Sequence, residues 1–338
     1  MDLNIIWFLL YGVLITGYAI LDGFDLGVGV LHLFTKDDKE KRINLNAIGP
    51  VWDGNEVWLL TAGGALFAAF PIVYATVFSA FYLALMLLLL FLILRAVSME
   101  FRGKIESSKW KNIWDWSFGL GSLVPALLFG VAVGNIMRGI PLNSDGVFTG
   151  NFFGLLNPYS LLVGVLSLTM FTMHGAVYLT LKTDGDHKKR MKSLIPKLWM
   201  GFVILYSLVT LYTMFEANFL FHGMLTNPLF WVFFLILLVS IFYLPIAVKS
   251  EKFGKAFIAS STIISGLIGL AAVSLFPRLT PSITNLDFSL TIYNASSTPR
   301  TLMTMLIIAL IGMPIVIAYT IFIYRTFKGK VDLTEESY

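Results

Sequence analysis

Long apolar runs alternate with short polar segments along almost the whole chain. Windows of about 20 apolar residues, the length that crosses a bilayer as a helix, recur nine times. They cover approximately residues 4–31, 50–70, 74–95, 115–137, 155–181, 197–217, 227–248, 255–277 and 302–325. This pattern predicts an all-α integral membrane protein with nine transmembrane helices, forming a single polytopic membrane domain over residues 1–338.

Two prolines mark helix boundaries within this pattern. Only residues 71–73, which begin with Pro71, separate the second and third predicted spans, so we expect a tight helical hairpin there. Pro299 follows Thr298, an arrangement typical of a first-turn proline behind a capping hydroxyl, and is expected to begin the last helix. The chain shows no convincing internal repeat, low-complexity region or soluble domain.

The composition agrees with a membrane protein and excludes several kinds of site. The chain is 57% hydrophobic and only 13% charged, whereas soluble domains carry about 25% charged residues. It contains no cysteine, which excludes disulfides, thiolate metal sites, iron–sulfur clusters and attached c-type haem. The first 35 residues contain no Lys or Arg, so we expect a retained first helix and no cleavable signal peptide.

The positive charges predict the orientation of the helices. Of the 24 Lys and Arg residues, 21 lie in alternate connections or near the C-terminus, at 32–49, 95–114, 182–197, 249–255 and 325–330. Cytoplasmic loops of membrane proteins carry such an excess, so the N-terminus is expected outside and the C-terminus in the cytoplasm. The net charge of +4 is then a topology signal, and we expect no nucleic-acid partner.

The two longest connections on the predicted outer side are residues 138–154 and 278–301. The second alternates like a strand over residues 288–294. We expect it to fold over the outer face of the bundle.

Four carboxylates lie within the first two predicted spans. Asp22 and Asp25 are near the end of the first span, and Asp53 and Glu56 begin the second. Ionisable groups at membrane depth usually line an ion path, a proton relay or a ligand pocket. The predicted orientation puts all four acids in the cytoplasmic half of the membrane, which favours a proton entry from the cytoplasm.

Asp25 and Asp53 are the main candidates for this proton pathway. Asp22 and Glu56 are secondary candidates, because their depth and the flanking turns also suit structural partners. The alternative for all four is that they cap helix ends, pair with loop Lys and Arg, or hold helices together. On the first helix, one face carries Tyr18, Asp22, Asp25, Gly29 and His32.

Small and polar residues around the acids are expected to have structural roles. Gly27 and Gly29 allow a neighbouring helix to approach closely. Trp52, Gly54 and Asn55 surround Asp53 and form a second structural motif. The run from Gly27 to Gly29 is not a nucleotide-binding loop, since no strand precedes it and no third glycine follows in register.

The histidines offer no haem site. The chain has His32, His174, His187 and His222, and only His174 lies well inside a predicted span. A bis-histidine haem needs two facing histidines, so we expect no haem ligand and no metal ligand on this chain. His174 is expected to be a hydrogen-bonded packing residue.

Two acids outside the main group have less definite roles. Asp115, between Trp114 and Trp116, is expected to be an interfacial anchor or a helix-start acid. Glu216 has no basic partner nearby in the sequence, and its role stays open.

Several long motifs resemble those of one family, the second subunit of cytochrome bd quinol oxidases, including the related cyanide-insensitive oxidases. They run in family order over essentially the whole chain: Asp22-Gly-Phe-Asp-Leu-Gly-Val-Gly29, Trp52-Asp-Gly-Asn-Glu-Val-Trp58, Thr61-Ala-Gly-Gly-Ala-Leu-Phe-Ala-Ala69, Trp114-Asp-Trp116, Gly150-Asn-Phe-Phe153, Leu156-Asn-Pro158 and Ser289-Leu-Thr-Ile-Tyr-Asn-Ala-Ser-Ser297. The segment 217–228 is shorter than in longer relatives, so quinone or accessory-subunit contacts made there by a loop are not carried over.

The resemblance implies a multi-pass protein of a bacterial or archaeal cytoplasmic membrane. It implies a heterodimer with a first subunit that holds haems b558, b595 and d, oxidises quinol (ubiquinol or menaquinol) and reduces O2 to water without proton pumping. Quinol protons leave outside, and acids matching Asp25 and Asp53 are implicated in supplying the consumed protons from the cytoplasm. This chain alone is then not catalytic and ligates no haem. A bound structural quinone and a small single-span accessory subunit occur in some members.

Two other classes of function stay open from the residues alone. A proton-coupled transporter would use Asp25 and Asp53 as coupling sites. Such transporters usually show paired repeats and broken helices near the midplane, and neither is evident here. A purely structural subunit would shield the haem-bearing subunit from lipid, and its acids would serve only packing.

Overall fold

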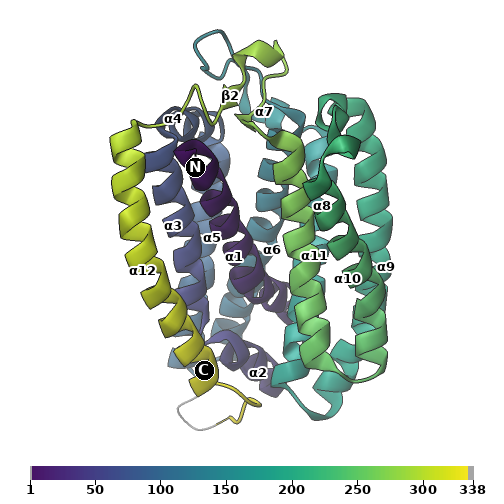
Figure 1. Ribbon diagram of the computed structural model, residues 1–338. Coiled ribbons are helices and arrows are strands. Elements are labelled where there is room, and N and C mark those ends of the chain that lie inside the picture. The colour runs from purple at the N-terminus through teal and green to yellow at the C-terminus, as the bar shows by residue number, and fades with distance from the viewer. Residues whose placement is uncertain (1, 334–338) are drawn as a thin grey trace.

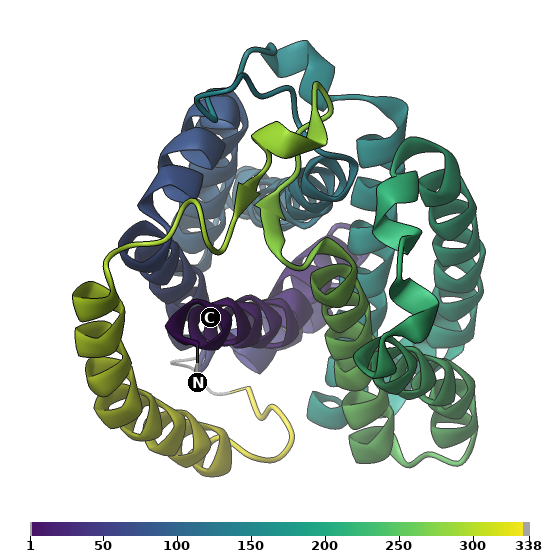
Figure 2. The same ribbon diagram turned by 45° about the horizontal axis from the view of Figure 1, so that its top comes forward.

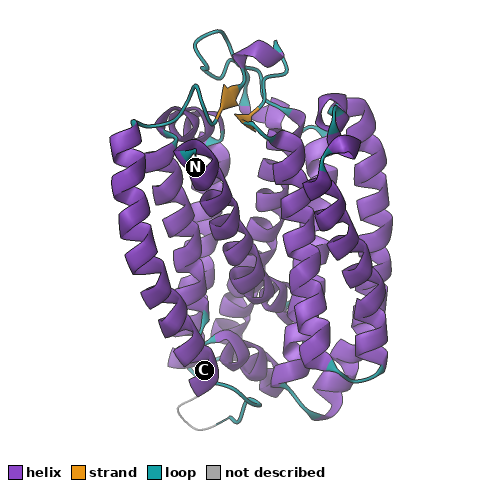
Figure 3. Cartoon of the chain, viewed as in Figure 1, coloured by secondary structure: helices purple, strands orange, loops and turns teal. Residues whose placement is uncertain are grey.

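Long helices run side by side along the height of the molecule, and short connections join them at the two ends (Figures 1 and 3). The computed structural model describes residues 2–333. The main helices are α1 (Leu3–His32), α2 (Asp38–Ile48), α3 (Trp52–Ala69), α4 (Pro71–Ala80), α5 (Tyr82–Phe101), α6 (Ser108–Arg138), α8 (Pro158–Lys182), α9 (Gly185–Glu216), α10 (Pro228–Lys249), α11 (Phe253–Leu275) and α12 (Pro299–Thr326).

Shorter elements lie in the connections. They are the helix α7 (Phe152–Leu155), the strands β1 (Arg278–Thr280) and β2 (Leu290–Thr291), and 3-10 turns at Arg102–Lys104, Asn218–Phe221, Met224–Thr226 and Leu286–Phe288. Below, the end of the bundle that carries the N-terminus is called the upper end and the opposite end the lower end, as in Figure 1.

Eight helices in residues 2–333 are long and apolar enough to cross a membrane: α1, α5, α6, α8, α9, α10, α11 and α12. The all-helical membrane fold expected from the sequence is therefore confirmed. The helix α3 covers the second predicted span and runs beside α12 (Figure 1). It has 18 residues, or about 27 Å at 1.5 Å per residue.

The prediction of a tight hairpin at residues 71–73 is wrong. Phe70 has φ −134° and ψ 65°, which ends α3, and Pro71 at the first turn of α4 starts a separate helix of 10 residues. The next helix, α5, begins only at Tyr82, so the third span is shifted from 74–95 to 82–101. An apolar window could not separate α4 from α5, because both are equally rich in apolar residues.

The helix α1 lies at the centre and contacts α3, α6, α8 and α11. Its lower half is completely surrounded, and every residue from Asp22 to His32 is buried. Glycines permit this packing: a Cβ at position 27 would overlap the backbone of Phe171 on α8, and a Cβ at position 29 would overlap Ser122 on α6. The sequence prediction for these two glycines agrees with this geometry.

The segments 138–154 and 278–301 lie together over the upper end (Figure 2). The strands β1 and β2 pair in antiparallel fashion, and the Ile140 amide donates to the Pro281 carbonyl at 3.0 Å. The second segment therefore folds over one end of the bundle, as its sequence pattern predicts.

The last helix, α12, stands along one edge of the bundle (Figure 2). Within it only Leu302 is buried. Its C-terminal end is tied to the connection between α8 and α9: Lys182 Nζ donates to the Phe327 carbonyl at 2.5 Å, and the Val331 amide donates to the Lys182 carbonyl at 2.9 Å. The two described ends of the chain lie at opposite ends of the bundle (Figure 1).

Candidate functional site

A buried polar cluster lies in the lower half of the bundle, where α1, α3 and α5 meet. We define it as Asp22, Asp25, Asn55, Glu56 and Arg95. Arg95 and Asp22 are both fully buried and form a bidentate pair, with Nη2–Oδ1 at 2.7 Å and Nη1–Oδ2 at 3.2 Å. Nη1 also donates to Glu56 Oε1 at 3.3 Å. The guanidinium therefore joins three helices by charge-assisted hydrogen bonds.

Asp25 does not share this guanidinium but is held by Asn55. The Asn55 Nδ2 group donates to Asp25 Oδ2 at 2.7 Å and to the Leu21 carbonyl at 3.2 Å. The amide oxygen of Asn55 accepts from the Tyr324 hydroxyl at 3.0 Å. A side chain of α12 thereby reaches the cluster through Asn55.

Three buried polar atoms at the cluster have no hydrogen-bond partner among residues 2–333. They are Asp25 Oδ1, Arg95 Nε and the Tyr18 hydroxyl. Buried polar atoms are usually paired, so these three atoms are candidates for binding a water molecule or a proton. The cluster contains three carboxyls and one guanidinium, and this imbalance of charge suits a site that binds protons.

The structure brings three of the four predicted acids together and leaves one outside. Asp53 is exposed. It lies three residues before Glu56, hence about one turn away on α3. The Glu56 side chain is 23% exposed. Glu56 therefore stands between an acid at the surface and the fully buried Asp22 and Asp25.

The two other residues of the α3 motif are placed differently. Trp52 packs against the main apolar core, while Gly54 is exposed and would have room for a side chain. In contrast, Asn55 is buried and bonded to Asp25.

Two residues of this site were not recognised in the sequence. The charge pattern assigns Arg95 to the 95–114 connection, which is wrong, since its side chain is fully buried inside α5. Its position at the end of an apolar run, with unpaired acids elsewhere in the membrane, was a signal for it. Tyr324 is 269 residues from Asn55 in the chain, and no local pattern marks it.

A second group of ion pairs lies at the lower end, where α1, α2 and α6 meet. Asp115 accepts from His32 Nε2 at 2.8 Å, Lys41 Nζ at 2.8 Å and Arg102 Nε at 2.5 Å. It is buried within α6. Because α6 begins at Ser108, about two turns before Asp115, the helix-start interpretation is wrong, whereas the role of interfacial anchor stays a prediction.

Arg102 connects this group to α2. Its Nη2 donates to Asp38 Oδ1 at 2.6 Å. Partial burial raises the pKa of Asp38, but the hydrogen bond from Arg102 and the charges of Arg102 and Lys111 outweigh burial and hold the pKa below its ordinary value. This arrangement fastens α2 to the ends of the long helices.

The histidine most deeply placed in the bundle is a packing residue in this structure. His174 is bonded through Nδ1 to Ser260 Oγ at 2.7 Å and through Nε2 to the Ile20 carbonyl at 3.0 Å. Its ring stacks on Phe257 with centroids 4.8 Å apart. Both ring nitrogens are engaged, as expected for a hydrogen-bonded packing residue. Glu216, whose role was open, accepts from Arg138 Nε at 2.8 Å.

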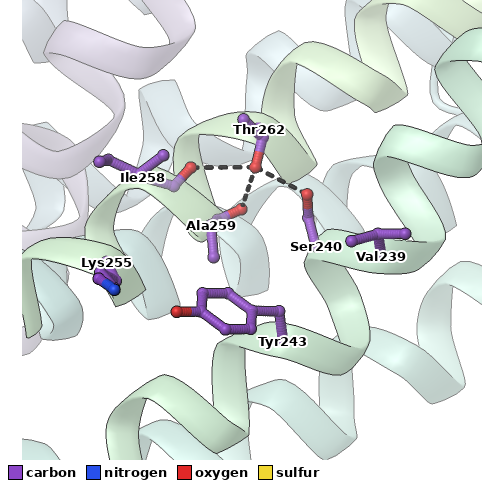
Figure 4. A pocket seen from close by; sticks show the side chains of 7 residues that line it. All are labelled: Val239, Ser240, Tyr243, Lys255, Ile258, Ala259 and Thr262. Atoms are coloured by element: carbon purple, nitrogen blue, oxygen red, sulfur yellow. Dashed lines mark hydrogen bonds between the residues drawn. The ribbon is translucent and has the colours of Figure 1, made fainter. Parts of the chain in front are cut away.

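Two cavities lie away from the buried polar cluster. The larger, of about 170 Å³, lies between α10 and α11 and is shown in Figure 4. The hydroxyls of Ser240 and Thr262 on its wall bond to each other at 2.7 Å. The other cavity, of about 130 Å³, lies at the upper end beside Asn135 and Arg138. Neither cavity brings carboxyl groups together, so the buried polar cluster remains the candidate site.

Comparisons with known proteins bear on the whole chain. A family model described as "Cytochrome bd terminal oxidase subunit II" matches residues 3–327. The chain is 38% identical to "Cytochrome bd-I ubiquinol oxidase subunit 2" of Escherichia coli (strain K12), covering 97% of this chain and 95% of that protein. It is 37% identical to "Cytochrome bd ubiquinol oxidase subunit 2" of Bacillus subtilis (strain 168), covering 99% and 98%.

A solved structure has the same fold. It is the bd oxidase from Geobacillus thermodenitrificans, with a TM-score of 0.80 over 97% of this chain and 99% of that chain. The sequence identity is 20%, so this likeness concerns the fold alone.

Proposed function

Because the chain belongs to the cytochrome bd terminal oxidase subunit II family, we propose that it is the non-haem-ligating subunit of a bd-type quinol:oxygen oxidoreductase and supplies cytoplasmic protons for the reduction of O2 to water. The family resemblance drawn from the motifs is confirmed. The chain is thus a multi-pass membrane subunit of a respiratory oxidoreductase complex, which implies a partner subunit I.

The observation that carries the proton-supply proposal is the graded burial of four acids. Asp53 is exposed, Glu56 is partly exposed, and Asp22 and Asp25 are fully buried. Acids spaced in this way from a surface to the interior can take up a proton and pass it inward. In this route Asp53 collects the proton, Glu56 transfers it, and Asp25 delivers it toward the partner subunit.

Arg95 and Asp22 have a different part in this proposal. Their bidentate pair is a fixed charge arrangement that holds α5 on α1. It keeps a positive charge beside the route, and so helps a negative carboxylate to exist in the apolar interior.

We further propose nine crossings, with the N-terminus outside and the C-terminus in the cytoplasm. Eight crossings would leave the two ends of the chain on the same side of the membrane, whereas the described ends lie at opposite ends of the bundle. The helix α3 runs along the bundle and would be the ninth crossing. After Arg95 is removed from the count, the basic residues still concentrate at the lower end. The positive-inside tendency therefore favours the lower end as the cytoplasmic one.

The haems b558, b595 and d are proposed to lie in the partner, where they would supply electron transfer and oxygen reduction. This placement is supported by His174, whose two ring nitrogens are both hydrogen-bonded within the bundle, and by His32, whose Nε2 is bonded to Asp115. Quinol, ubiquinol or menaquinol, would then be oxidised on the partner. We include a bound structural quinone and a small accessory subunit in this proposal only because some family members contain them.

The proton-supply proposal is tested by Asp25→Asn and Asp53→Asn. Each variant keeps the size of the side chain but removes the titrating group, so we expect O2 consumption with quinol to fall by about tenfold or more while haem content stays normal. The matched control is Asp145→Asn, an exposed acid in the segment over the upper end. Normal turnover in both test variants would sink the proposal.

The purely structural role remains the second candidate, because the Arg95–Asp22 pair and the Asn55 bonds also hold helices together. It predicts that Asp25→Asn changes stability and haem content and leaves turnover per haem unchanged, and that Asp53→Asn, at an exposed position, changes none of these. The transporter alternative is disfavoured, since the family match covers residues 3–327.

A further inference from the structure

The geometry points to a positioning role for Asn55 and Tyr324: together they direct the proton that Asp25 carries to one oxygen, Oδ1. This inference rests on the proposed function, because it concerns how Asp25 takes up and releases a proton. It adds two side chains from α3 and α12 that do not themselves titrate in the route.

The amide of Asn55 has one orientation that satisfies all its neighbours. Its nitrogen donates to the Leu21 carbonyl at 3.2 Å and to Asp25 Oδ2 at 2.7 Å. Its oxygen accepts from the Tyr324 hydroxyl at 3.0 Å. A rotation by half a turn would set the amide oxygen against the Leu21 carbonyl oxygen and the amide nitrogen against the tyrosine. The backbone carbonyl and the tyrosine thus fix the amide from two sides.

This orientation makes the two oxygens of Asp25 unequal. Oδ2 always faces an N–H group, so a proton placed on Oδ2 would meet another hydrogen. Oδ1 is buried and has no hydrogen-bond partner among residues 2–333. An incoming proton therefore forms its O–H bond at Oδ1 and converts the carboxylate to the neutral acid. The same bond breaks when the proton leaves, while the Asn55 contact at Oδ2 stays in place.

Tyr324 is held in place although α12 is mostly exposed. The chain beyond it is fastened by the hydrogen bonds of Phe327 and Val331 with Lys182, and Lys330 Nζ donates to the Thr183 carbonyl at 2.7 Å. These contacts begin three residues after Tyr324. They anchor the lower end of α12 to the α8–α9 connection, so the hydroxyl is kept against Asn55.

Other titratable groups around Asp25 also influence the pH dependence of the route. They come from each packed helix: Tyr18 and Asp22 from α1, Glu56 from α3, Arg95 from α5, Tyr178 and His174 from α8, and Tyr324 from α12. On the remaining neighbours, Asp115 of α6 is engaged by His32 and Lys255 of α11 is exposed. Tyr324→Phe leaves all these charges unchanged and removes only the hydroxyl that orients Asn55.

The experiment compares Tyr324→Phe with Tyr319→Phe in the purified oxidase complex. Tyr319 lies on the same helix and is 61% exposed, so it controls for a tyrosine change on α12. We measure the pH profile of O2 consumption and the infrared band of the Asp25 carboxyl, identified as the band that Asp25→Asn removes. A merely structural role of Tyr324 would move neither readout while haem content stays normal.

For Tyr324→Phe we expect turnover at neutral pH to fall by roughly fivefold, the factor that corresponds to one ordinary hydrogen bond. The pH profile should move by about 0.7 unit toward higher pH, because the Asn55 N–H that donates to Asp25 is held less firmly without the tyrosine hydroxyl, so the carboxylate is stabilised less and keeps its proton more firmly. The Asp25 band should broaden or shift. Asn55→Leu should change both readouts further, and Tyr319→Phe should change neither.

The outcomes separate this inference from the proposed function. If Asp25→Asn slows turnover but Tyr324→Phe matches Tyr319→Phe in pH profile and infrared band, the positioning role is wrong and the proton route stands. If Asp25→Asn leaves turnover normal, the route is wrong, and the infrared band still reports whether Tyr324 acts on the Asp25 carboxyl.

Discussion

Arg95 is the residue on which the buried polar cluster depends most strongly. Its guanidinium has no exposed surface, and it is the cation that bonds Asp22 and Glu56 within the described chain. A buried pair of charges adds little net stability compared with apolar packing, but removal of one partner leaves the other charge uncompensated. The loss should therefore be much larger than for an ion pair at the surface.

We expect Arg95→Gln to destabilise the complex by about 3–5 kcal/mol, the usual cost of breaking a buried pair. The matched control is Arg138→Gln, whose pair with Glu216 is 28% and 29% exposed and should contribute no more than about 1 kcal/mol. For both variants we measure the midpoint of thermal unfolding and the haem content of the purified complex. Arg95→Gln combined with Asp22→Asn should regain part of the loss. A double variant no more stable than Arg95→Gln would contradict the pairing.

At the scale of elements, the contact between α1 and α8 sets the position of the acids. Gly27 on α1 faces Gly175 on α8, and a Cβ at position 175 would lie 2.5 Å from backbone atoms of Gly27 and Val28. The two backbones touch because neither residue has a side chain. This contact is half a turn beyond Asp25, so any separation of the helices would displace that carboxyl from Asn55.

We expect Gly27→Ala to lower stability by about 1–3 kcal/mol, the cost of adding volume to a packed interface, and to reduce turnover. Gly12→Ala on the same helix is the control, because a Cβ there meets no atom within 4 Å. It should be neutral or slightly stabilising, since alanine favours a helix over glycine. Thermal unfolding and O2 consumption of the two variants are compared side by side. Equal unfolding midpoints would show that the close approach is not required.

At the scale of the whole molecule, apolar side chains cover much of the outside. The outward faces of α10 and α12 expose Val239, Phe242, Ile308 and Leu310, among others. The buried polar cluster lies inside. Such a distribution suits a bundle whose outer surface contacts lipid or a membrane partner. In the proposed orientation, the positive charges at the lower end keep that end in the cytoplasm.

The proposed orientation can be tested without background labelling, because the chain has no cysteine. Ser144→Cys lies in the exposed segment over the upper end, and Ser108→Cys lies at the exposed lower end of α6. A membrane-impermeant maleimide should label Ser144→Cys in intact cells and label Ser108→Cys only after the membrane is opened. The reverse pattern would invert the topology.

Much of the fold could be predicted from the sequence, and the reason is local. Lipid offers no hydrogen-bond partner to backbone N–H and C=O groups, so apolar runs of membrane length form helices that satisfy these groups internally. The predicted spans and the observed helices therefore largely coincide. The error at residues 71–81 arose where two apolar helices follow each other. Hydrophobicity does not record the break in direction that Phe70, Pro71 and Phe81 introduce.

The acids of the candidate site could also be found in the sequence, because a carboxylate in an apolar run is costly and therefore conspicuous. The residues that pair with these acids could not be found in the sequence. Arg95 lies 73 residues from Asp22, and Tyr324 lies 269 residues from Asn55, so their pairing depends on how helices pack side by side.

The sequence by itself determined the class of protein, the positions of most helices and the acids proposed for the candidate site, since each follows from the free energy of placing a residue in lipid or water. Only the tertiary structure decided that Arg95 belongs with Asp22, that Asp53 stays at the surface, and that Asn55 and Tyr324 hold Asp25. These pairings arise from the close packing of α1 with its neighbours, which Gly27 and Gly29 permit. Packing of this kind joins residues that have no relation along the chain.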